Sequence, residues 1–150
     1  MDLGLAGKKV VITGGSRGIG RAIATKMLEE GASVAICARG QEGVDEALAA
    51  LQGKGTIIGQ AVDVSNGDEL ETWLQSSAEQ LGGVDILINN ASGGGGGQTD
   101  EKFDANYNVD LMGLVRGVRA TEEFLSASGE GAVLTISSTA ALEHFGPGPT

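Results

Sequence analysis

Four glycines follow an apolar segment near the start of the chain and form a turn that could bind phosphate. The segment reads VVITGGSRGIG over residues 10–20, and its glycines are Gly14, Gly15, Gly18 and Gly20. Because glycine has no β-carbon, such a backbone can turn sharply and approach a pyrophosphate closely. The helix that follows would present unpaired N–H groups and partial positive charge to this anion. A strand-to-helix turn without a ligand is the alternative, since glycine-rich turns occur in many loops.

The spacing of the glycines separates several kinds of nucleotide site. No Lys-Ser or Lys-Thr pair closes the turn, which argues against a P-loop. The pattern Thr13-Gly14-x-x-x-Gly18-x-Gly20 also differs from G-x-G-x-x-G, and it resembles the TGxxxGxG signature of the short-chain dehydrogenase/reductase (SDR) family. In that family the turn holds the phosphates on the adenosine side of a dinucleotide. The candidate cofactor-binding residues of the turn are Thr13, Gly14, Ser16, Arg17, Gly18, Ile19 and Gly20.

The end of the second apolar segment indicates which dinucleotide is bound. An acidic side chain there would bind the ribose 2′-hydroxyl and repel a 2′-phosphate, but this chain has Ala38 followed by Arg39. NADP(H) is therefore favoured over NAD(H), which is the alternative, and Arg17 can add a second cation. A surface arginine without a ligand is the other interpretation of Arg39.

The third apolar segment ends in Asp63-Val64-Ser65. We expect Ser65 to cap the next helix, which would leave Asp63 free to accept a hydrogen bond from an adenine amino group. The family resemblance gives Asp63 and Val64 this contact with adenine. From chemistry alone, an aspartate that caps the helix is an almost equal alternative.

The fourth apolar segment runs into Asn89-Asn90-Ala91-Ser92, which resembles the NNAG motif of the family with Ser92 in place of its glycine. Two amides at a strand end can satisfy backbone groups and hold a cofactor ribose, so Asn90 and Ala91 are candidate binding residues. The glycines at 93–97 follow. We interpret them as a mobile loop on the substrate side, with a linker without function as the alternative.

Two candidate catalytic residues come from the resemblance. Ser138 corresponds to the serine that orients the substrate carbonyl. Asp110 stands where family members usually have an asparagine that takes part in a water-linked proton relay. Since an ionised aspartate accepts hydrogen bonds and does not donate them, the relay would need a raised pKa or a different water arrangement. His144 lies farther along without a paired nucleophile, and no metal site is predicted.

The elements that must position these residues form an α/β pattern, in which apolar segments alternate with helical ones. We expect strands over 9–13, 33–37, 56–62, 84–89 and 132–137. Right-handed crossovers then predict a Rossmann-like, doubly wound parallel sheet of order 3-2-1-4-5, with ligands at the carboxyl ends of the strands. Apolar spacing predicts core stripes on the four helices: Ile19, Ile23 and Met27; Val44, Leu48 and Leu51; Leu70, Trp73, Leu74, Ala78 and Leu81; Phe103, Tyr107, Leu111, Leu114, Val115 and Val118. Tyr107, one turn from Phe103 and Leu111, is expected to be a core or interface residue rather than the catalytic tyrosine.

Composition limits the class of protein and its partners. The length of 150 residues suits a single dinucleotide-binding domain, and a net charge of −10 makes nucleic acid and an anionic membrane poor partners. No apolar run is long enough for a membrane span, and no secretory leader is recognised. The single cysteine, Cys37, is interpreted as a small buried hydrophobe. Together these features predict a cytoplasmic protein.

The resemblance implies an NADP(H)-dependent oxidoreductase that interconverts a carbonyl and a secondary alcohol by hydride transfer. It covers Lys8 to Thr150 but stops short of the family's Tyr-x-x-x-Lys motif, which supplies the proton donor. We therefore expect the chain to be the front portion of a longer SDR domain, inactive alone, with residues 133–136 as a hydrophobic edge. The complete protein is expected to be a homo-oligomer, either a dimer or a tetramer, acting on a small molecule.

Two other functions are alternatives to the oxidoreductase. A nucleotide-binding protein without catalysis is supported by Asp110 and by the lack of the tyrosine and lysine. A methyltransferase would need an acid near the end of the second strand, and Ala38 and Arg39 argue against it.

Overall fold

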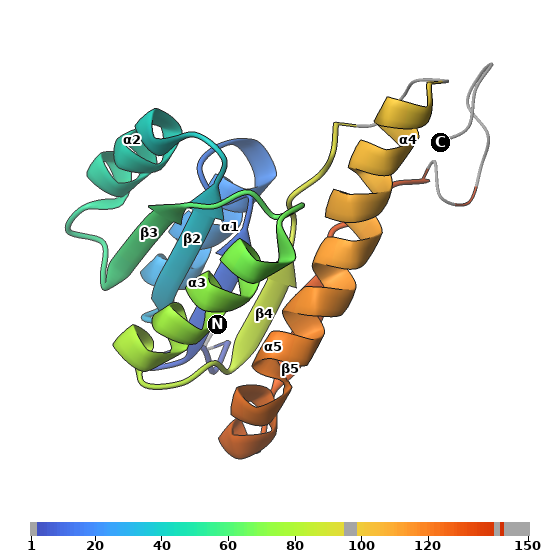
Figure 1. Cartoon of the computed structure of the whole chain (residues 1–150). Coiled ribbons are helices and arrows are strands. Elements are labelled where there is room, and N and C mark those ends of the chain that lie inside the picture. Colours follow the sequence, from blue (N-terminus) through green and yellow to red (C-terminus); the bar gives the residue numbers. More distant parts are fainter. Residues whose placement is uncertain (1–2, 95–98, 140–141, 143–150) are drawn as a thin grey trace.

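The computed structural model describes residues 3–94, 99–139 and 142. Within this part, the strands form a parallel five-stranded sheet of order β3-β2-β1-β4-β5, which confirms the predicted topology (Figure 1). β1 lies in the centre, where Val10 is paired with Val34 on one side and with Ile86 on the other. The strands are β1 (Lys9–Thr13), β2 (Ser33–Ala38), β3 (Ile57–Ala61), β4 (Ile86–Asn89) and β5 (Ala132–Thr135).

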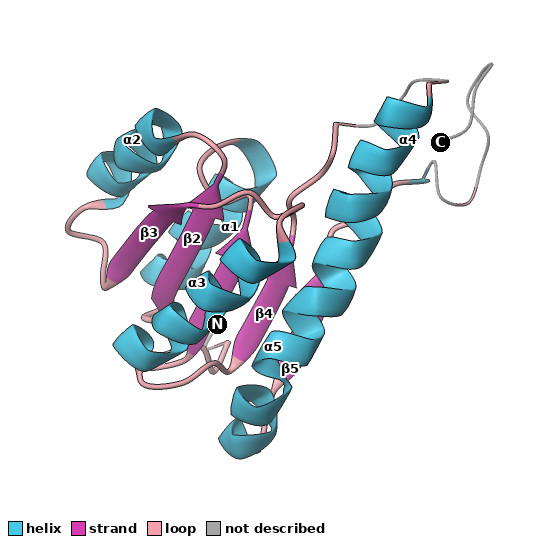
Figure 2. Cartoon of the chain, viewed as in Figure 1, coloured by secondary structure: helices cyan, strands magenta, loops and turns pink. Residues whose placement is uncertain are grey.

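Helices cover both faces of the sheet (Figure 2). The helical elements are α1 (Gly18–Glu29), α2 (Gln41–Leu51), α3 (Gly67–Leu81), α4 (Asp100–Asn106), the π-helical turn η1 (Tyr107–Leu111) and α5 (Met112–Ser128). One core joins α3 and α5 to Val11 and Leu87, and the other joins α1 and α2 to Val10 and Ile12. Because successive strand residues enter opposite cores, the central strands are apolar throughout, as is typical of a parallel sheet. None of the helices in the described ranges is long and apolar enough to cross a bilayer.

The predicted core stripe of α1 is wrong at its first residue, Ile19. Ile23 and Met27 are partly buried and pack against the core, as predicted. The residues buried along α1 are Gly20, Ala24 and Leu28, whereas Ile19 is 61% exposed. Gly20 packs so closely that a Cβ there would overlap the Gly14 carbonyl oxygen. This contact turns the small residue toward the sheet and leaves Ile19 beside the carboxyl ends of the strands.

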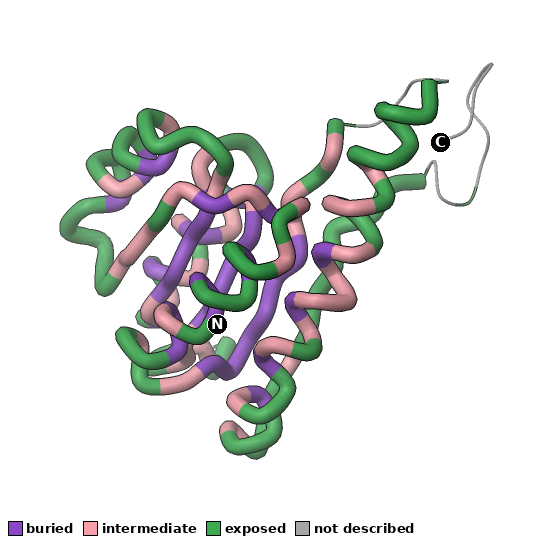
Figure 3. The backbone as a smooth tube through the Cα atoms, in the orientation of Figure 1, coloured by how far each residue is buried: buried purple, intermediate pink, exposed green. Residues whose placement is uncertain are grey.

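The predicted stripe of the fourth helix is also wrong in its first half. Phe103, Tyr107 and Leu111 are 63%, 46% and 49% exposed. The helix is interrupted by the π-turn η1, and α4 extends beyond the edge of the sheet, where nothing in the described chain covers it (Figures 1 and 3). The residues buried along α5 are instead mostly small: Gly113, Gly117, Thr121 and Leu125.

Asn66, not Ser65, caps α3. Its side-chain oxygen accepts hydrogen bonds from the backbone N–H groups of Asp68 (3.2 Å) and Glu69 (3.4 Å). The expectation that Ser65 caps α3 is therefore wrong. Asn66, the next residue, satisfies the first free N–H groups of the helix instead.

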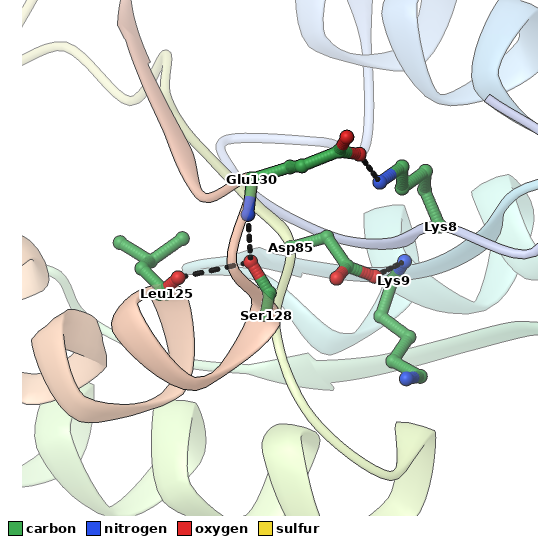
Figure 4. A network of polar contacts seen from close by, with 6 residues as sticks. All are labelled: Lys8, Lys9, Asp85, Leu125, Ser128 and Glu130. Carbon is green, nitrogen blue, oxygen red and sulfur yellow. Dashed lines mark hydrogen bonds and ion pairs between the residues drawn. The ribbon is translucent and has the colours of Figure 1, made fainter. Parts of the chain in front are cut away.

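β5 lies at the edge of the sheet in the described chain, with Val133, Leu134 and Ile136 exposed. The hydrophobic edge expected at residues 133–136 is therefore observed. The other end of β5 is tied to β1 and β4 by the polar network in Figure 4. There, Asp85 Oδ2 accepts from the Lys9 backbone N–H at 2.7 Å, and Lys8 Nζ forms an ion pair of 2.7 Å with Glu130.

We expect Asp85→Ala to lower the free energy of unfolding by about 1–3 kcal/mol, because it leaves the partly buried backbone N–H of Lys9 without its carboxyl acceptor. Asp85 is 9% exposed, whereas the Glu130 side chain is 78% exposed. Glu130→Gln is the control, and it should leave the stability unchanged because exposed ion pairs contribute little. Urea unfolding of both variants measures the difference, and equal losses would contradict the importance of the Asp85 hydrogen bond.

Candidate functional site

Two adjoining hollows lie at the carboxyl ends of the strands. The alternation of strands and helices in the sequence predicts that a ligand binds at these ends. The larger has a volume of about 590 Å³ and lies over the ends of β1, β2 and β3, and the smaller, of about 420 Å³, lies over the ends of β4 and β5. They share the lining residues Ile19, Val64, Asn90, Ala91, Ser92 and Val109. A single extended ligand can therefore reach from one hollow into the other.

The glycine turn has the close packing that its spacing predicts. Gly14 has φ +69°, and a Cβ there would lie 2.9 Å from Ala91 Cα. Gly18 has φ +54° and no atom within 4 Å of a Cβ position, so its bare backbone faces open space in the larger hollow. Gly14 and Gly20 therefore make the turn compact, while Gly18 leaves room beside it.

Two helices begin at the larger hollow without a side-chain cap. The residue before α1 is Arg17, the residue before α2 is Gly40, and neither offers a side chain to the first N–H groups. No acidic residue lies in the first turn of α1. Free N–H groups and the positive end of the α1 dipole therefore favour an anion at this end of the hollow.

Two arginines add positive charge to the same hollow. Arg17 and Arg39 are exposed and line it together with Ser16 and Ala38. In residues 3–94, 99–139 and 142, neither guanidinium is paired with a carboxylate. Both cations are thus free to bind a phosphate group.

Thr13 and Asn90 join the ends of β1 and β4. The Asn90 side-chain amide donates to the carbonyl oxygens of Thr13 (3.1 Å) and Gly14 (2.9 Å). Thr13 Oγ1 accepts from the backbone N–H groups of Asn90 (3.1 Å) and Ala91 (3.2 Å). Of the two amides expected to satisfy backbone groups, the Asn90 amide therefore does so, whereas the Asn89 amide nitrogen has no partner in the described chain.

Asp63 and Val64, the residues expected to contact adenine, line the larger hollow, and Asp63 does not cap α3. Asp63 Oδ1 accepts hydrogen bonds from the backbone N–H (2.9 Å) and the hydroxyl (2.7 Å) of Ser65. Its second oxygen, Oδ2, has no hydrogen bond within the described chain and can accept one from a ligand.

Asp110 and Ser138 both line the smaller hollow. Asp110 lies in η1, and its Oδ1 accepts a hydrogen bond of 2.8 Å from the Gly93 backbone N–H. Gly93 packs tightly against the helix, since a Cβ there would lie 2.6 Å from Asn106 Oδ1. Asp110 therefore acts as an acceptor that holds the segment after β4.

Sequence reasoning missed the residues that bring α5 close to the hollows. A Cβ on Gly113 would lie 2.7 Å from Val64 Cγ1, and one on Gly117 would lie 3.1 Å from Asn89 Oδ1. Asn89 lines the smaller hollow, and its amide nitrogen is buried without a partner in the described chain. The spacing of Gly113, Gly117 and Thr121 by four residues was the signal that could have identified this close packing.

Cys37 lies beneath the glycine turn at the end of β2. Burial raises the pKa of its thiol to about 12, and the Gly14 backbone hydrogen bond lowers it only in part. The thiol therefore remains neutral, and the prediction of a buried small hydrophobe is confirmed.

Of the other sequence features, residues 95–97 of the glycine run and His144 lie outside the described residues.

Known proteins of one family are similar to this chain in sequence. The profile of the short chain dehydrogenase family matches residues 8–149. Isoepoxydon dehydrogenase patN of Penicillium expansum is 36% identical over 149 residues, which is 97% of this chain and 58% of that protein. The uncharacterized oxidoreductase YvrD of Bacillus subtilis is 37% identical over 147 residues, which is 95% of this chain and 56% of that protein. The chain thus spans little more than half the length of these curated relatives.

Solved structures show the same arrangement. L-Sorbose reductase from Gluconobacter frateurii, complexed with NADPH and L-sorbose, has a TM-score of 0.91 and 34% identity, covering 98% of this chain and 59% of that one. A 7α-hydroxysteroid dehydrogenase complexed with NADH has a TM-score of 0.88 and 30% identity, covering 94% of this chain and 57% of that one. Similar proteins therefore include complexes with either dinucleotide.

Proposed function

The chain belongs to the short-chain dehydrogenase family of oxidoreductases, and on this premise we propose that it serves an NADP(H)-dependent interconversion of a carbonyl and a secondary alcohol. The observation that carries the proposal is the pair of guanidinium groups of Arg17 and Arg39, which have no carboxylate partner among the described residues and lie beside the uncapped start of α1. A 2′-phosphate and a pyrophosphate are the anions that this pairing of charge and free N–H groups suits.

The residues of the larger hollow fit a dinucleotide. A Cβ at Gly18 would project into open space, so the backbone there leaves room for a pyrophosphate. The proposed phosphate ligands are Gly14, Ser16, Arg17, Gly18 and Ile19; Asp63 and Val64 would contact adenine, and Asn90 and Ala91 a ribose. Thr13 and Gly20 would support this site from below, through the Asn90 hydrogen bonds and the packing of α1.

The preference for NADP(H) depends on Arg39. In place of an acid that would repel a 2′-phosphate, β2 ends in Ala38, and Arg39 follows at the rim of the larger hollow. NAD(H) is the alternative cofactor, because one of the similar structures is a complex with NADH.

The smaller hollow would hold the carbonyl or alcohol substrate. When bound, the nicotinamide supplies the hydride chemistry, and the protein supplies position and polarity. We assign to Ser138 the donation of its hydroxyl proton in a hydrogen bond to the substrate carbonyl oxygen. Asp110 would hold Gly93 and the segment after β4 at the edge of the hollow.

A nucleotide-binding protein without catalysis is the second candidate, favoured by the engagement of Asp110 with Gly93 in place of an asparagine relay. Two measurements on the complete protein separate the candidates, since residues 1–150 are expected to be inactive alone: a titration with NADPH, and loss of NADPH absorbance in the presence of a panel of small ketones. Tight binding with ketone-dependent oxidation supports the oxidoreductase. Binding without oxidation supports the second candidate, and no binding of either dinucleotide contradicts both.

We also propose that the complete protein is a homo-oligomer, a dimer or a tetramer. The support is the exposed apolar stripe of Phe103, Tyr107 and Leu111, which a second copy could cover. A monomeric mass by sedimentation would contradict this. Residues 1–150 would act as one nucleotide-binding domain of a cytoplasmic protein, and the one thiol of these residues, Cys37, is buried.

A further inference from the structure

A hydrogen-bonded path connects Arg116, on α5, to the carboxylate of Asp63. Arg116 Nη1 donates to the Ser65 carbonyl oxygen at 3.0 Å. The N–H and hydroxyl of the same serine donate to Asp63 Oδ1 at 2.9 Å and 2.7 Å. Ser65 thus links the Arg116 guanidinium to Asp63. Among the described residues, Asp63 is the only acidic one that lines the larger hollow.

The packing around this path holds Arg116 in one place. Its guanidinium lies against Gly67, where a Cβ would be 3.0 Å from Arg116 Nε. One helical turn earlier, Gly113 leaves room for Val64, since a Cβ there would lie 2.7 Å from Val64 Cγ1. The loop from Asp63 to Gly67 is therefore pressed against α5, which lies beside α3 (Figure 1).

Arg116 does not form an ion pair within the described residues, so its role is not that of a partner for a carboxylate. It is half-buried, and it donates to a backbone carbonyl in the turn that Asp63 begins. Without the Arg116 donor, the turn at Ser65 would be less fixed. The Asp63 carboxylate, which Ser65 holds, would then no longer point in one direction. A carboxylate with one oxygen fixed by Ser65 can offer the other to a ligand in a defined direction.

We propose that Arg116 is a positioning residue that, through Ser65, aims Asp63 at the exocyclic amino group of adenine and so sets the selectivity of the site for adenine over a 6-oxopurine. The inference rests on the proposed function, because it takes the occupant of the larger hollow to be NADP(H). A 6-oxopurine presents a carbonyl oxygen where adenine presents an amino group. A fixed carboxylate would accept from the amino group and repel the oxygen.

The test compares the affinities for NADPH and for its hypoxanthine analogue, nicotinamide hypoxanthine dinucleotide phosphate in reduced form. We expect the unmodified protein to bind NADPH about tenfold more tightly than the analogue. Arg116→Met should bring this ratio close to one, mainly by weakening NADPH. Arg116→Lys, which keeps a donor for the Ser65 carbonyl, should restore part of the ratio. A general loss of stability would weaken both ligands together and leave the ratio unchanged.

Arg119→Met is the matched control, because it removes the same charge from the same helix. Arg119 is exposed, and it has no hydrogen bond or ion pair within the described chain, so the ratio should stay at its original value. Asp63→Ala should abolish the ratio, and adding Arg116→Met to it should change the ratio no further. Should Arg116→Met fail to fold, Ser65→Ala removes one of the two hydrogen bonds to Asp63 and should reduce the ratio partly.

Three results would overturn the inference. A full ratio in Arg116→Met, or in Ser65→Ala where that variant is used, would show that the path does not aim Asp63. An unmodified protein that binds NADPH without distinguishing the analogue would show that Asp63 does not read the amino group, while leaving the proposed function intact. An unmodified protein that binds neither NADPH nor NADH would remove the proposed function and this inference with it.

Discussion

Gly18→Val is expected to abolish detectable binding of NADPH while leaving the sheet folded. Gly18 has φ +54°, and its missing side chain leaves open space within the larger hollow. A valine side chain would fill the place where the backbone and a pyrophosphate must approach each other. We expect the dissociation constant to rise at least about a hundredfold, which corresponds to about 3 kcal/mol.

Gly53→Val is the matched control for this substitution. Gly53 has φ +84°, a Cβ there also meets no atom within 4 Å, and the residue does not line either hollow. Both variants carry a similar backbone strain of about 1–2 kcal/mol, but only Gly18→Val blocks the proposed phosphate site. The fluorescence of the single, buried tryptophan, Trp73, shows whether each variant is folded. Normal NADPH binding by folded Gly18→Val would show that the turn does not hold the phosphates.

The sheet could be predicted because its strands are marked by composition alone. The central strands enter a core on each face, so residues 10–12 and 34–37 are apolar without interruption. The strand boundaries were less accurate. The fourth strand begins at Ile86 rather than at residue 84, and the carboxyl group of Asp85, just before it, accepts a hydrogen bond from the Lys9 N–H.

Helix faces could not be read from apolar spacing where small residues make the contact. In α1 the structure buries Gly20 and Ala24 together with Leu28, whereas the larger Ile23 and Met27 lie partly buried at the edge of the same core. In α5 the buried positions again include two glycines, at 113 and 117. Hydrophobic spacing favours large side chains, whereas close approach of a helix to a strand requires their absence.

The location of the candidate site followed from the rule that ligands bind at the carboxyl ends of parallel strands, but its polar connections did not. The hydrogen bond from the Asn90 N–H to Thr13 joins residues 77 positions apart, and that from Arg116 to Ser65 joins residues 51 positions apart. Local sequence patterns carry no information on such pairs. They depend on the order of the strands and on the depth to which α5 packs.

Arg39→Asp is expected to reverse the choice of dinucleotide. Arg39 lines the larger hollow beside Ala38 and Gly40, and no carboxylate in the described chain neutralises it. The substitution replaces an attraction for the 2′-phosphate of NADPH by a repulsion, and it offers the 2′-hydroxyl of NADH an acceptor. We expect NADPH affinity to fall about a hundredfold, while NADH affinity stays the same or rises.

Arg119→Asp makes the same change of charge on the exposed side of α5, away from either hollow, and should alter both affinities little because distant surface charges are screened by salt. Titration of each variant with NADPH and with NADH at physiological ionic strength gives the ratio of dissociation constants. Repeating it at higher salt should reduce the preference of the unmodified protein for NADPH, since part of that preference is Coulombic. Equal losses of both cofactors in Arg39→Asp would mean that Arg39 stabilises the site without reading the 2′-phosphate, and Arg17 would then be the cation to replace.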